Sequence, residues 1–362
     1  MTKQRILTEE VLRAFAFQPN AGYRPFGAGH INDTFLVESP EKTQILQRIN
    51  KAVFPSPENI MDNISRVTAF ITRKVALRGG NPDREVMQII KTVNGELYFT
   101  DQAGDYWRGV KFIDNTEAYE TVTDIDMLAK AGYAFGDFQN LLKDFPAGEL
   151  HEIIRDFHNT PVRLAQLRRA VSENRAGRLH SVQEEIEFAL RHETDCRHLT
   201  DLLQSGELPL KVTHNDTKMS NVLIDKDTSE AVCIIDLDTI MPGLTAYDFG
   251  DSIRAGATTA AEDESDLEKV RFSIPLYQAY TKGFLSAAGD SLTEKELDTL
   301  PIGAKLMTLE VGMRFLADYL NGDIYFKTAY ETHNLVRARN QFKLVTEMEK
   351  SMDEMLDIIK IS

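Results

Sequence analysis

The stretch from His214 to Asn221 has the residue types and the spacing that phosphoryl transfer requires. It reads H-x-D-x-K-x-x-N, and the apolar residues 222–224 follow it directly. Asp216 could accept a proton from an attacking hydroxyl group, because a carboxylate can act as a general base without competing as a strong nucleophile. Lys218 could place a positive charge on the phosphoryl group that is transferred. This pattern predicts a catalytic loop with Asp216 and Lys218 as its reactive side chains.

Two side chains could bind a magnesium ion next to this loop. Asn221 closes the motif with a neutral oxygen, and Asp236 follows a second apolar run, residues 232–235, with an anionic one. These are the hard oxygen ligands that Mg²⁺ prefers. Taken singly, each residue has an ordinary explanation: a histidine before a strand is usually structural, and an asparagine in a loop usually forms a turn. The complete order favours the catalytic interpretation, with His214 packed beneath the loop.

A second acidic motif, Asp248-Phe249-Gly250, lies further along the chain and could be mistaken for the metal site. No apolar strand precedes it, and its surroundings predict the start of a helix. We therefore assign the metal to Asp236, whose position after a strand suits metal binding. Asp248 is predicted to cap a helix or to brace a neighbouring loop.

Length and charge narrow the possible functions. A chain of 362 residues is long enough for two domains or lobes. The net charge of −15 argues against a nucleic-acid partner or an anionic membrane surface, because both need a basic patch. Any phosphate site must therefore be built locally. Cys196 and Cys233 are too few for a disulfide framework, residues 1–5 lack a signal sequence, and no segment could span a membrane, so we expect a cytoplasmic protein. The sequence leaves the oligomeric state open.

The first third of the chain predicts a glycine-containing hairpin at residues 23–37. Gly27 and Gly29 lie between strand-like flanks, and their backbone N–H groups could approach nucleotide phosphates closely. An ordinary glycine hairpin is the alternative. The next strand, residues 44–50, alternates so that Arg48 shares a face with Leu46.

The elements that follow are expected to complete a small N-terminal lobe. Helices are predicted at 7–17 and 57–76, and strands at 86–92, 97–100 and 106–112. Phe112 and Ile113 end the last strand and are expected to form a hinge. Their backbone could bind an adenine edge, and apolar side chains could enclose the ring.

The remainder of the chain is predicted to be mainly helical. Helices are expected at 121–144, 151–175 with a break near 159–161, 181–204, 265–288, 294–321 and 333–358. The segment 312–326 combines an apolar helical face with Arg314 and Tyr325. Its ordinary explanation is a helix that ends at Asn321-Gly322, with Tyr325 in the core and Arg314 in a surface ion pair.

The catalytic motif resembles that of the kinase-like phosphotransferases, which include protein kinases, aminoglycoside phosphotransferases and choline kinases. The resemblance implies Asp216 as catalytic base and Asn221 and Asp236 as Mg²⁺ ligands, with ATP as co-substrate. It also implies a two-lobed α+β kinase-like fold, with a small lobe at 1–114 and a large lobe at 115–362. These families carry a lysine on the strand where this chain has Gln47 and Arg48. Either Arg48 reaches the phosphates, or the charge comes from elsewhere.

A narrower resemblance spans both lobes. The segments FGAGHINDTF, ILQRIN, HNDTKMSNVLID, IIDLDTIMPG and GMRFLADYLNGDIYF are similar to those of the N-acetylhexosamine 1-kinases. The resemblance implies phosphorylation of the anomeric hydroxyl of GlcNAc or GalNAc, with Arg314 and Tyr325 as sugar contacts. We add Asp33 as a candidate sugar ligand, because a bound sugar needs several polar partners.

Two other functions stay open from the sequence. The acceptor could be another small hydroxyl compound, such as choline, ethanolamine, homoserine or an aminoglycoside. A cationic acceptor would need an acidic or aromatic pocket, which the overall charge permits. A non-catalytic nucleotide-binding protein is the remaining alternative, and the missing strand lysine is its only support. The intact set of Asp216, Asn221 and Asp236 argues against it.

Overall fold

The computed structural model describes residues 7–27, 29, 31–121 and 124–362. The expectation that residues 1–5 lack a signal sequence lies outside this part, as do two residues of the helix expected from 121. The chain divides into two compact units, neither of which is continuous in sequence. Unit 1 comprises Met1–Glu117, Glu149–Ile154 and Leu223–Met241, and unit 2 comprises the remainder. The lobe boundary expected at residue 114 stays a prediction.

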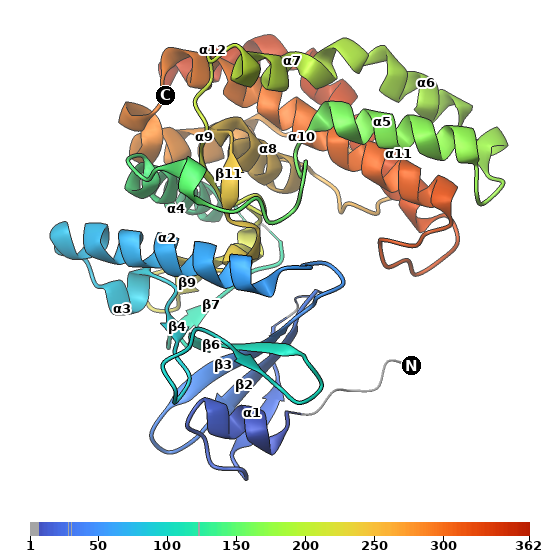
Figure 1. Cartoon of the computed structure of the whole chain (residues 1–362). Coiled ribbons are helices and arrows are strands. Elements are labelled where there is room, and N and C mark those ends of the chain that lie inside the picture. Colours follow the sequence, from blue (N-terminus) through green and yellow to red (C-terminus); the bar gives the residue numbers. More distant parts are fainter. Residues whose placement is uncertain (1–6, 28, 30, 122–123) are drawn as a thin grey trace. The chain divides into compact units, whose positions relative to one another are not determined.

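Unit 1 is built around a six-stranded antiparallel sheet (Figure 1). Its strand order is β1-β2-β3-β6-β4, with β5 also paired to β6. The strands are β1 (Gly22–Pro25), β2 (Asp33–Glu38), β3 (Thr43–Ile49), β4 (Ile89–Ile90), β5 (Phe99–Thr100) and β6 (Tyr106–Lys111). The hairpin expected at 23–37 is confirmed, because Tyr23 pairs with Val37 across β1 and β2. The strands expected at 86–92 and 97–100 are shorter than predicted.

One face of this sheet packs against the N-terminal helix α1 (Glu9–Ala14). Leu12 and Phe15 lie in one apolar cluster with Phe35, Leu46 and Trp107, and all five are at most 5% exposed. Burial of such side chains is the main favourable contribution to folding. The alternation predicted for residues 44–50 therefore holds: Leu46 faces the core, and its neighbours on either side face away.

Helix α2 (Pro57–Leu77) lies at the position predicted for it. Its apolar stripe is buried, and Asn63 on the same helix is also completely buried. The Asn63 amide bonds both the N–H and the carbonyl of His151 and also the carbonyl of Ile240. It thereby ties three separate segments of unit 1 together. A second sheet in this unit has the order β10-β9-β7, formed by β7 (Thr116–Glu117), β9 (Val222–Asp225) and β10 (Ala231–Ile234), with the short helix α3 (Pro82–Glu85) nearby.

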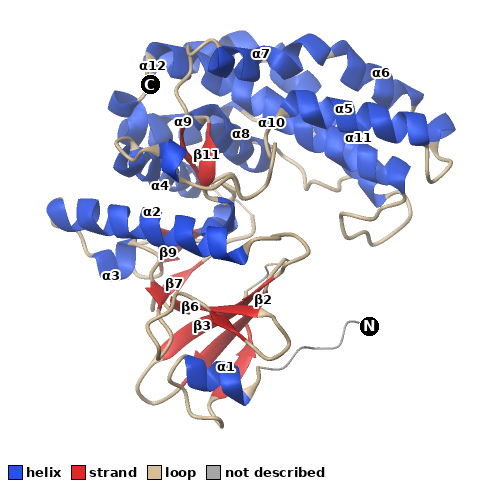
Figure 2. Cartoon of the chain, viewed as in Figure 1, coloured by secondary structure: helices blue, strands red, loops and turns tan. Residues whose placement is uncertain are grey.

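Unit 2 is mostly helical (Figure 2). Strands β8 (Lys211–Thr213) and β11 (Met241–Gly243) form a two-stranded sheet. The helices are α4 (Ile125–Leu142), α5 (Thr160–Glu173), α6 (Gln183–Arg191), α7 (Glu193–Gln204), α8 (Thr245–Gly256), α9 (Ile274–Ala288), α10 (Glu294–Asn321), α11 (His333–Lys350) and α12 (Met352–Ile361).

The long helix α10 packs against α5, α8 and α11. Its contact with α8 brings the two backbones together at Gly303 and Gly250. A Cβ atom on Gly303 would lie 2.2 Å from the carbonyl oxygen of Ala246, so only glycine fits there. Helix α8 is thus held against α10 at backbone distance.

Several helix boundaries differ from the sequence-based expectation. Helix α5 begins at Thr160, because the Asn159 side chain caps it and Pro161 fits the first turn rather than breaking a helix. The helix expected at 181–204 is divided at His192, whose ring is held by the carbonyl of Phe188 and by Glu349. The helix expected from 265 begins only at Ile274.

Two properties of the described residues concern membrane-spanning helices and the reactivity of the cysteines. None of their helices combines the length and the apolar character needed to cross a lipid bilayer. Cys196 and Cys233 are free and buried, and burial raises the pKa of both thiols to about 12. Both cysteines are therefore unreactive as nucleophiles at neutral pH.

Candidate active site

Asp248 on helix α8 holds the loop that carries Asp216. The Asp248 carboxylate accepts hydrogen bonds from the backbone N–H groups of His214 (2.9 Å) and Asn215 (2.7 Å) and from the Gln139 amide (2.6 Å). Asp248 lies in the first turn of α8, whose N-cap residue is Leu244. The prediction that Asp248 braces a loop is confirmed, and the alternative that it caps the helix is wrong.

A second set of contacts joins the same loop to α8. The Thr217 hydroxyl donates to the Asp248 carbonyl, and the Ser252 hydroxyl donates to the Thr217 carbonyl (2.7 Å). His214 is completely buried, and its Nδ1 accepts the backbone N–H of Asp216 (3.2 Å). This confirms the structural interpretation of His214. The backbone on both sides of Asp216 is therefore rigidly held.

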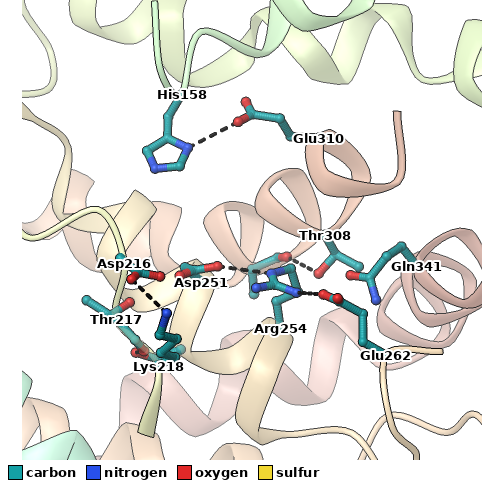
Figure 3. A network of polar contacts seen from close by, with 12 residues as sticks. His158, Asp216, Thr217, Lys218, Asp251, Arg254, Glu262, Thr308, Glu310 and Gln341 are labelled. Atoms are coloured by element: carbon teal, nitrogen blue, oxygen red, sulfur yellow. Dashed lines mark hydrogen bonds and ion pairs between the residues drawn. The ribbon is translucent and has the colours of Figure 1, made fainter. Parts of the chain in front are cut away.

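The structure brings together the three loop residues that the sequence singles out. The Lys218 Nζ lies 3.0 Å from Asp216 Oδ2 (Figure 3). The Asn221 amide nitrogen donates to the Asp216 carbonyl (2.7 Å) and to Asp216 Oδ2 (3.1 Å). Since its nitrogen is used in this way, the amide oxygen of Asn221 is the atom suited to a cation. The Asp216 side chain stays partly exposed, which the predicted role of a base requires.

Asp236 belongs to unit 1, between β10 and a short 3₁₀ turn at Leu237–Thr239. Its backbone has the left-handed conformation (φ 61°), which is uncommon for a residue other than glycine. The strand-then-aspartate context expected for Asp236 is confirmed, and its role as a metal ligand stays a prediction.

A buried ion pair that the sequence did not predict lies two residues beyond Asp236. The guanidinium of Arg108 on β6 pairs with Asp238, and the two side chains are 1% and 5% exposed. Asn32 donates to the other oxygen of Asp238 (2.6 Å), and Arg108 also donates to Gln47 (3.0 Å). The register of β3 with β6 places Gln47 directly opposite Arg108. A buried positive charge therefore exists beside the strand that lacks the lysine.

The predicted phosphate and sugar ligands Arg48 and Asp33 are bonded to each other. The Arg48 guanidinium contacts the Asp33 carboxylate through two nitrogens and lies 3.2 Å from Asp105. Only 15% of the Arg48 side chain is exposed. Either residue would have to exchange this ion pair for a ligand, so both roles stay predictions.

The predicted nucleotide contacts lie where the sequence placed them in unit 1. Gly27 is exposed and has φ 76°, a conformation that favours glycine, and Gly29 is also exposed. Phe112 follows β6 and meets the ring of Phe26 edge-on, with centroids 5.8 Å apart. Ile113 is buried, and its carbonyl accepts the Thr116 hydroxyl. Their binding roles remain predictions.

Arg314 and Tyr325 come together in unit 2. The Arg314 guanidinium lies 5.5–5.8 Å from the ring centres of Phe157, Tyr325 and Phe326. It makes no ion pair with any residue that the structure describes. Helix α10 does end at Gly322, as expected. Tyr325, however, is 62% exposed, so the alternative of a core tyrosine and an ion-paired arginine is wrong.

The loop after α10 is shaped by one buried carboxylate. Asp318 accepts the backbone N–H groups of the three residues 324–326, at 2.9–3.0 Å. The Asn334 amide also donates to Asp318 (3.0 Å). These bonds present the Tyr325 ring at the surface.

Sequence reasoning missed a polar network in unit 2 that includes Asp251 and His158 (Figure 3). Asp251 Oδ1 accepts from Arg254 (3.0 Å), which also donates to Glu262 (2.9 Å). His158 Nδ1 lies 3.1 Å from Glu310. Burial raises the pKa of Asp251, but the charge and hydrogen bond of Arg254, together with the charge of Lys218, outweigh burial and leave this pKa below its ordinary value. The only signal in the sequence was the spacing of Asp248 and Asp251, which places both on one face of α8.

A cluster of His192, Asp195 and Glu349 has the residue types of a metal site. The ammonium group of Lys305 already lies 2.8 Å from Asp195 and 3.5 Å from Glu349. The positive charge of Lys305 therefore already balances the carboxylates of this cluster.

Comparison with known proteins agrees with this geometry. The sequence model of the phosphotransferase enzyme family matches residues 22–282, and the chain belongs to this family. The fold is the α+β kinase-like fold predicted from the sequence.

Three solved structures illustrate the likeness. A microcompartment-associated aminopropanol kinase is 18% identical with a TM-score of 0.64, over 96% of this chain and 97% of that one. An aminoglycoside phosphotransferase from Alicyclobacillus acidocaldarius is 12% identical with a TM-score of 0.63, over 100% and 98%. An ethanolamine kinase from Plasmodium vivax is 14% identical with a TM-score of 0.58, over 92% and 87%. Likeness at these identities concerns the fold.

Proposed function

We propose that the chain transfers the γ-phosphoryl group of ATP to a small molecule, and that the acceptor is the anomeric hydroxyl of an N-acetylhexosamine. The observation that carries the transfer step is the arrangement of Asp216, Lys218 and Asn221 on a loop that Asp248 braces. The membership of the phosphotransferase enzyme family supports the same reaction class.

In the proposed reaction, Asp216 accepts the proton of the sugar hydroxyl. The hydroxyl oxygen forms a bond to the γ-phosphorus while the bond from this phosphorus to the bridging oxygen of ADP breaks. Lys218 lies 3.0 Å from Asp216 and keeps a positive charge beside the reacting atoms. Most of the rate enhancement in such reactions comes from positioning and charge neutralisation.

Asn221 and Asp236 are the proposed Mg²⁺ ligands. An amide oxygen and a carboxylate are the donor set that this ion prefers, so the residues present fit it. When bound, Mg²⁺ neutralises charge on the nucleotide phosphates. The Asn221 amide nitrogen holds Asp216, so this one residue links the proposed base to the proposed metal site.

The nucleotide would be bound by unit 1 in this proposal. The backbone at Gly27 and Gly29 approaches the phosphates, Arg48 exchanges its pair with Asp33 for a phosphate oxygen, and the segment of Phe112 and Ile113 encloses the adenine.

Arg314 and Tyr325 support a sugar as the acceptor. A guanidinium held between aromatic rings, without a carboxylate partner in the described residues, offers hydrogen-bond donors beside an apolar surface. Sugars present hydroxyl groups and an apolar ring face, which such a surface matches. Asp33 is the third proposed sugar ligand.

An amino alcohol is the second candidate acceptor. The aminopropanol and ethanolamine kinases with the same fold motivate it. Asp251 and Glu310 could attract an ammonium group, but each is already bonded to a nitrogen of Arg254 or His158. The uncompensated arginine at 314 opposes a cationic acceptor.

The test is ADP release by the purified protein with ATP and Mg²⁺. The acceptor panel holds GlcNAc, GalNAc, glucose, ethanolamine, choline, homoserine and kanamycin. We expect turnover with an N-acetylhexosamine and a product phosphate that is stable to alkali but labile to acid, as an anomeric phosphate is. Turnover with an amine alone would overturn the sugar assignment.

A further inference from the structure

The imidazole of His158 is buried and fixed on one side only. The side chain is 6% exposed, and Nδ1 lies 3.1 Å from Glu310 Oε1. The Thr160 hydroxyl donates to the other oxygen of Glu310 (3.0 Å), whose side chain has no exposed surface. Nε2 is buried as well, but it has no hydrogen-bond partner among the described residues. Buried polar atoms nearly always have a partner, so Nε2 requires one.

The bond to Glu310 determines what this partner must be. A carboxylate accepts only, so Nδ1 donates its hydrogen to Glu310. In the neutral ring, Nε2 then carries a lone pair and accepts. The missing partner is therefore a group with an O–H or N–H.

The Asp251 carboxylate offers a second hydrogen-bond acceptor that lacks a donor. Its Oδ1 is bonded by Arg254, and Arg254 is held in turn by Glu262. Its Oδ2 makes no hydrogen bond within the part of the chain that the structure describes. Asp251 is 6% exposed, so it is buried but not wholly covered.

Both acceptors belong to unit 2, as the proposed base does. Asp251 is one turn after Asp248 on α8, and its neighbour Ser252 bonds the carbonyl of Thr217, next to Asp216. In the view of Figure 3, the Asp251 and Asp216 carboxylates are drawn in the same region, and the Nε2 side of His158 is turned toward it. The charge of Lys218 acts on Asp251, which agrees with this placement.

We propose that His158 Nε2 and Asp251 Oδ2 form a subsite that binds a hydroxyl or amide N–H donor of the acceptor molecule, away from the hydroxyl that is phosphorylated. This rests on the proposed transfer to a small hydroxyl compound and names two residues that select it. Protein atoms cover Nε2, so a donor reaches it only when a neighbouring side chain moves. The rings of Phe157 and Tyr247 pack against the imidazole, with centroids at 4.4 and 5.4 Å, and are the neighbours whose movement would admit a donor.

The experiment compares His158→Phe, His158→Gln and Asp251→Asn with two controls. The controls are His198→Phe and Asp353→Asn, which change exposed residues of the same types on α7 and α12. For each protein, the KM for the acceptor, the KM for ATP and the ADP release without acceptor are measured. His158→Gln keeps an acceptor oxygen, so it is the conservative variant.

We expect His158→Phe to raise the acceptor KM roughly tenfold or more, because a buried hydrogen bond is lost. The ATP KM stays within about twofold, and His158→Gln recovers part of the loss. Acceptor analogues that each lack one donor group identify the contact. The analogue that lacks the donor bound by His158 has a higher KM with the wild type than the intact acceptor has. With this analogue, His158→Phe raises the KM little further.

Two results would overturn the subsite. In the first, the acceptor KM of both His158→Gln and Asp251→Asn equals that of the controls. In the second, the fold-increase in KM caused by a variant is the same with every analogue as with the intact acceptor. No donor group is then coupled to His158 or Asp251. If His158→Phe does not fold, the Gln variant and the analogue series still decide. The proposed function is judged separately, by which acceptor the wild type phosphorylates. If this is an amino alcohol, the sugar proposal fails, and the same variants are compared on that acceptor.

Discussion

Arg108 and Asp238 form a buried ion pair whose members are separated by 130 residues in the sequence. Asp238 also accepts from Asn32, so both of its oxygens are bonded. The pair fixes the turn that begins at Asp236, the proposed metal ligand. Through Gln47 it also supports strand β3.

Removal of Arg108 tests this relationship. Arg108→Met leaves the Asp238 carboxylate buried without its cation, so we expect the free energy of unfolding to fall by roughly 3–5 kcal/mol. Urea unfolding measures this loss. The double variant Arg108→Met with Asp238→Leu recovers much of the loss, because neither charge is then unpaired. As a control, Arg169→Met breaks an exposed pair with Glu173 and has little effect. Equal losses in the single and double variants would contradict this account.

Asp216→Asn tests the proposed base. The amide is similar in size but cannot accept the proton, so we expect kcat to fall roughly 10²- to 10⁴-fold. Nucleotide binding, measured by equilibrium titration, stays close to that of the wild type. Asp353→Asn is the control for the same chemical change at an exposed position. Full activity of Asp216→Asn would show that another group takes the proton.

Asp236→Asn tests the proposed metal ligand. Loss of the anionic oxygen weakens the attraction for Mg²⁺, so a higher Mg²⁺ concentration is needed for half-maximal activity. The measurement is a Mg²⁺ titration at saturating ATP, and chelation of the metal abolishes turnover of the wild type. An unchanged Mg²⁺ requirement in Asp236→Asn would remove this residue from the metal site.

Arg314→Lys tests the acceptor side. Lysine keeps the charge but loses the planar donor groups that lie between the aromatic rings, so the acceptor KM rises about tenfold. The KM for ATP changes little. Arg197→Lys, an exposed substitution on α7, is the matched control. A rise in the KM for ATP alone would place Arg314 on the nucleotide side.

The lowered pKa of Asp251 predicts a pH-dependent stability. A carboxyl group with a lower pKa in the folded state stabilises the fold above its unfolded pKa of about 3.9 and loses this contribution as the pH falls. The difference in unfolding free energy between the wild type and Asp251→Asn should therefore be largest near neutral pH and shrink in acid. Asp353→Asn gives the baseline for a surface aspartate. A difference that does not vary with pH would contradict the shift.

The sequence identified the proposed catalytic loop and the strands around it because the expected chemistry depends on local spacing. The distances from Asp216 to Lys218 and Asn221 follow from a few residues of backbone. The local context of Asp248 predicted either a helix cap or a loop brace, and only the brace is found. The partners of Asp248 are not local, because its carboxylate bonds the backbone of His214 and Asn215, more than 30 residues earlier.

The remaining features depend on contacts between distant segments. His158 and Glu310 are 152 residues apart in the sequence, and nothing near either residue indicates the other. The break between α6 and α7 at His192 likewise depends on Glu349, 157 residues away. The Arg48–Asp33 pair could not be read from the strand pattern, because alternation gives the face of a side chain but not its partner.

The close approach of α8 and α10 at Gly303 has a consequence for how the acceptor could change during evolution. Helix α8 carries the brace of the catalytic loop, and α10 carries Glu310 and Arg314. Because the backbones of the two helices are in contact, the proposed acceptor ligands on α10 and the residues of α8 that hold the proposed base are rigidly connected. Under the proposed function, we expect that side chains on α10 can be exchanged and a new compound accommodated while the position of Asp216 is kept.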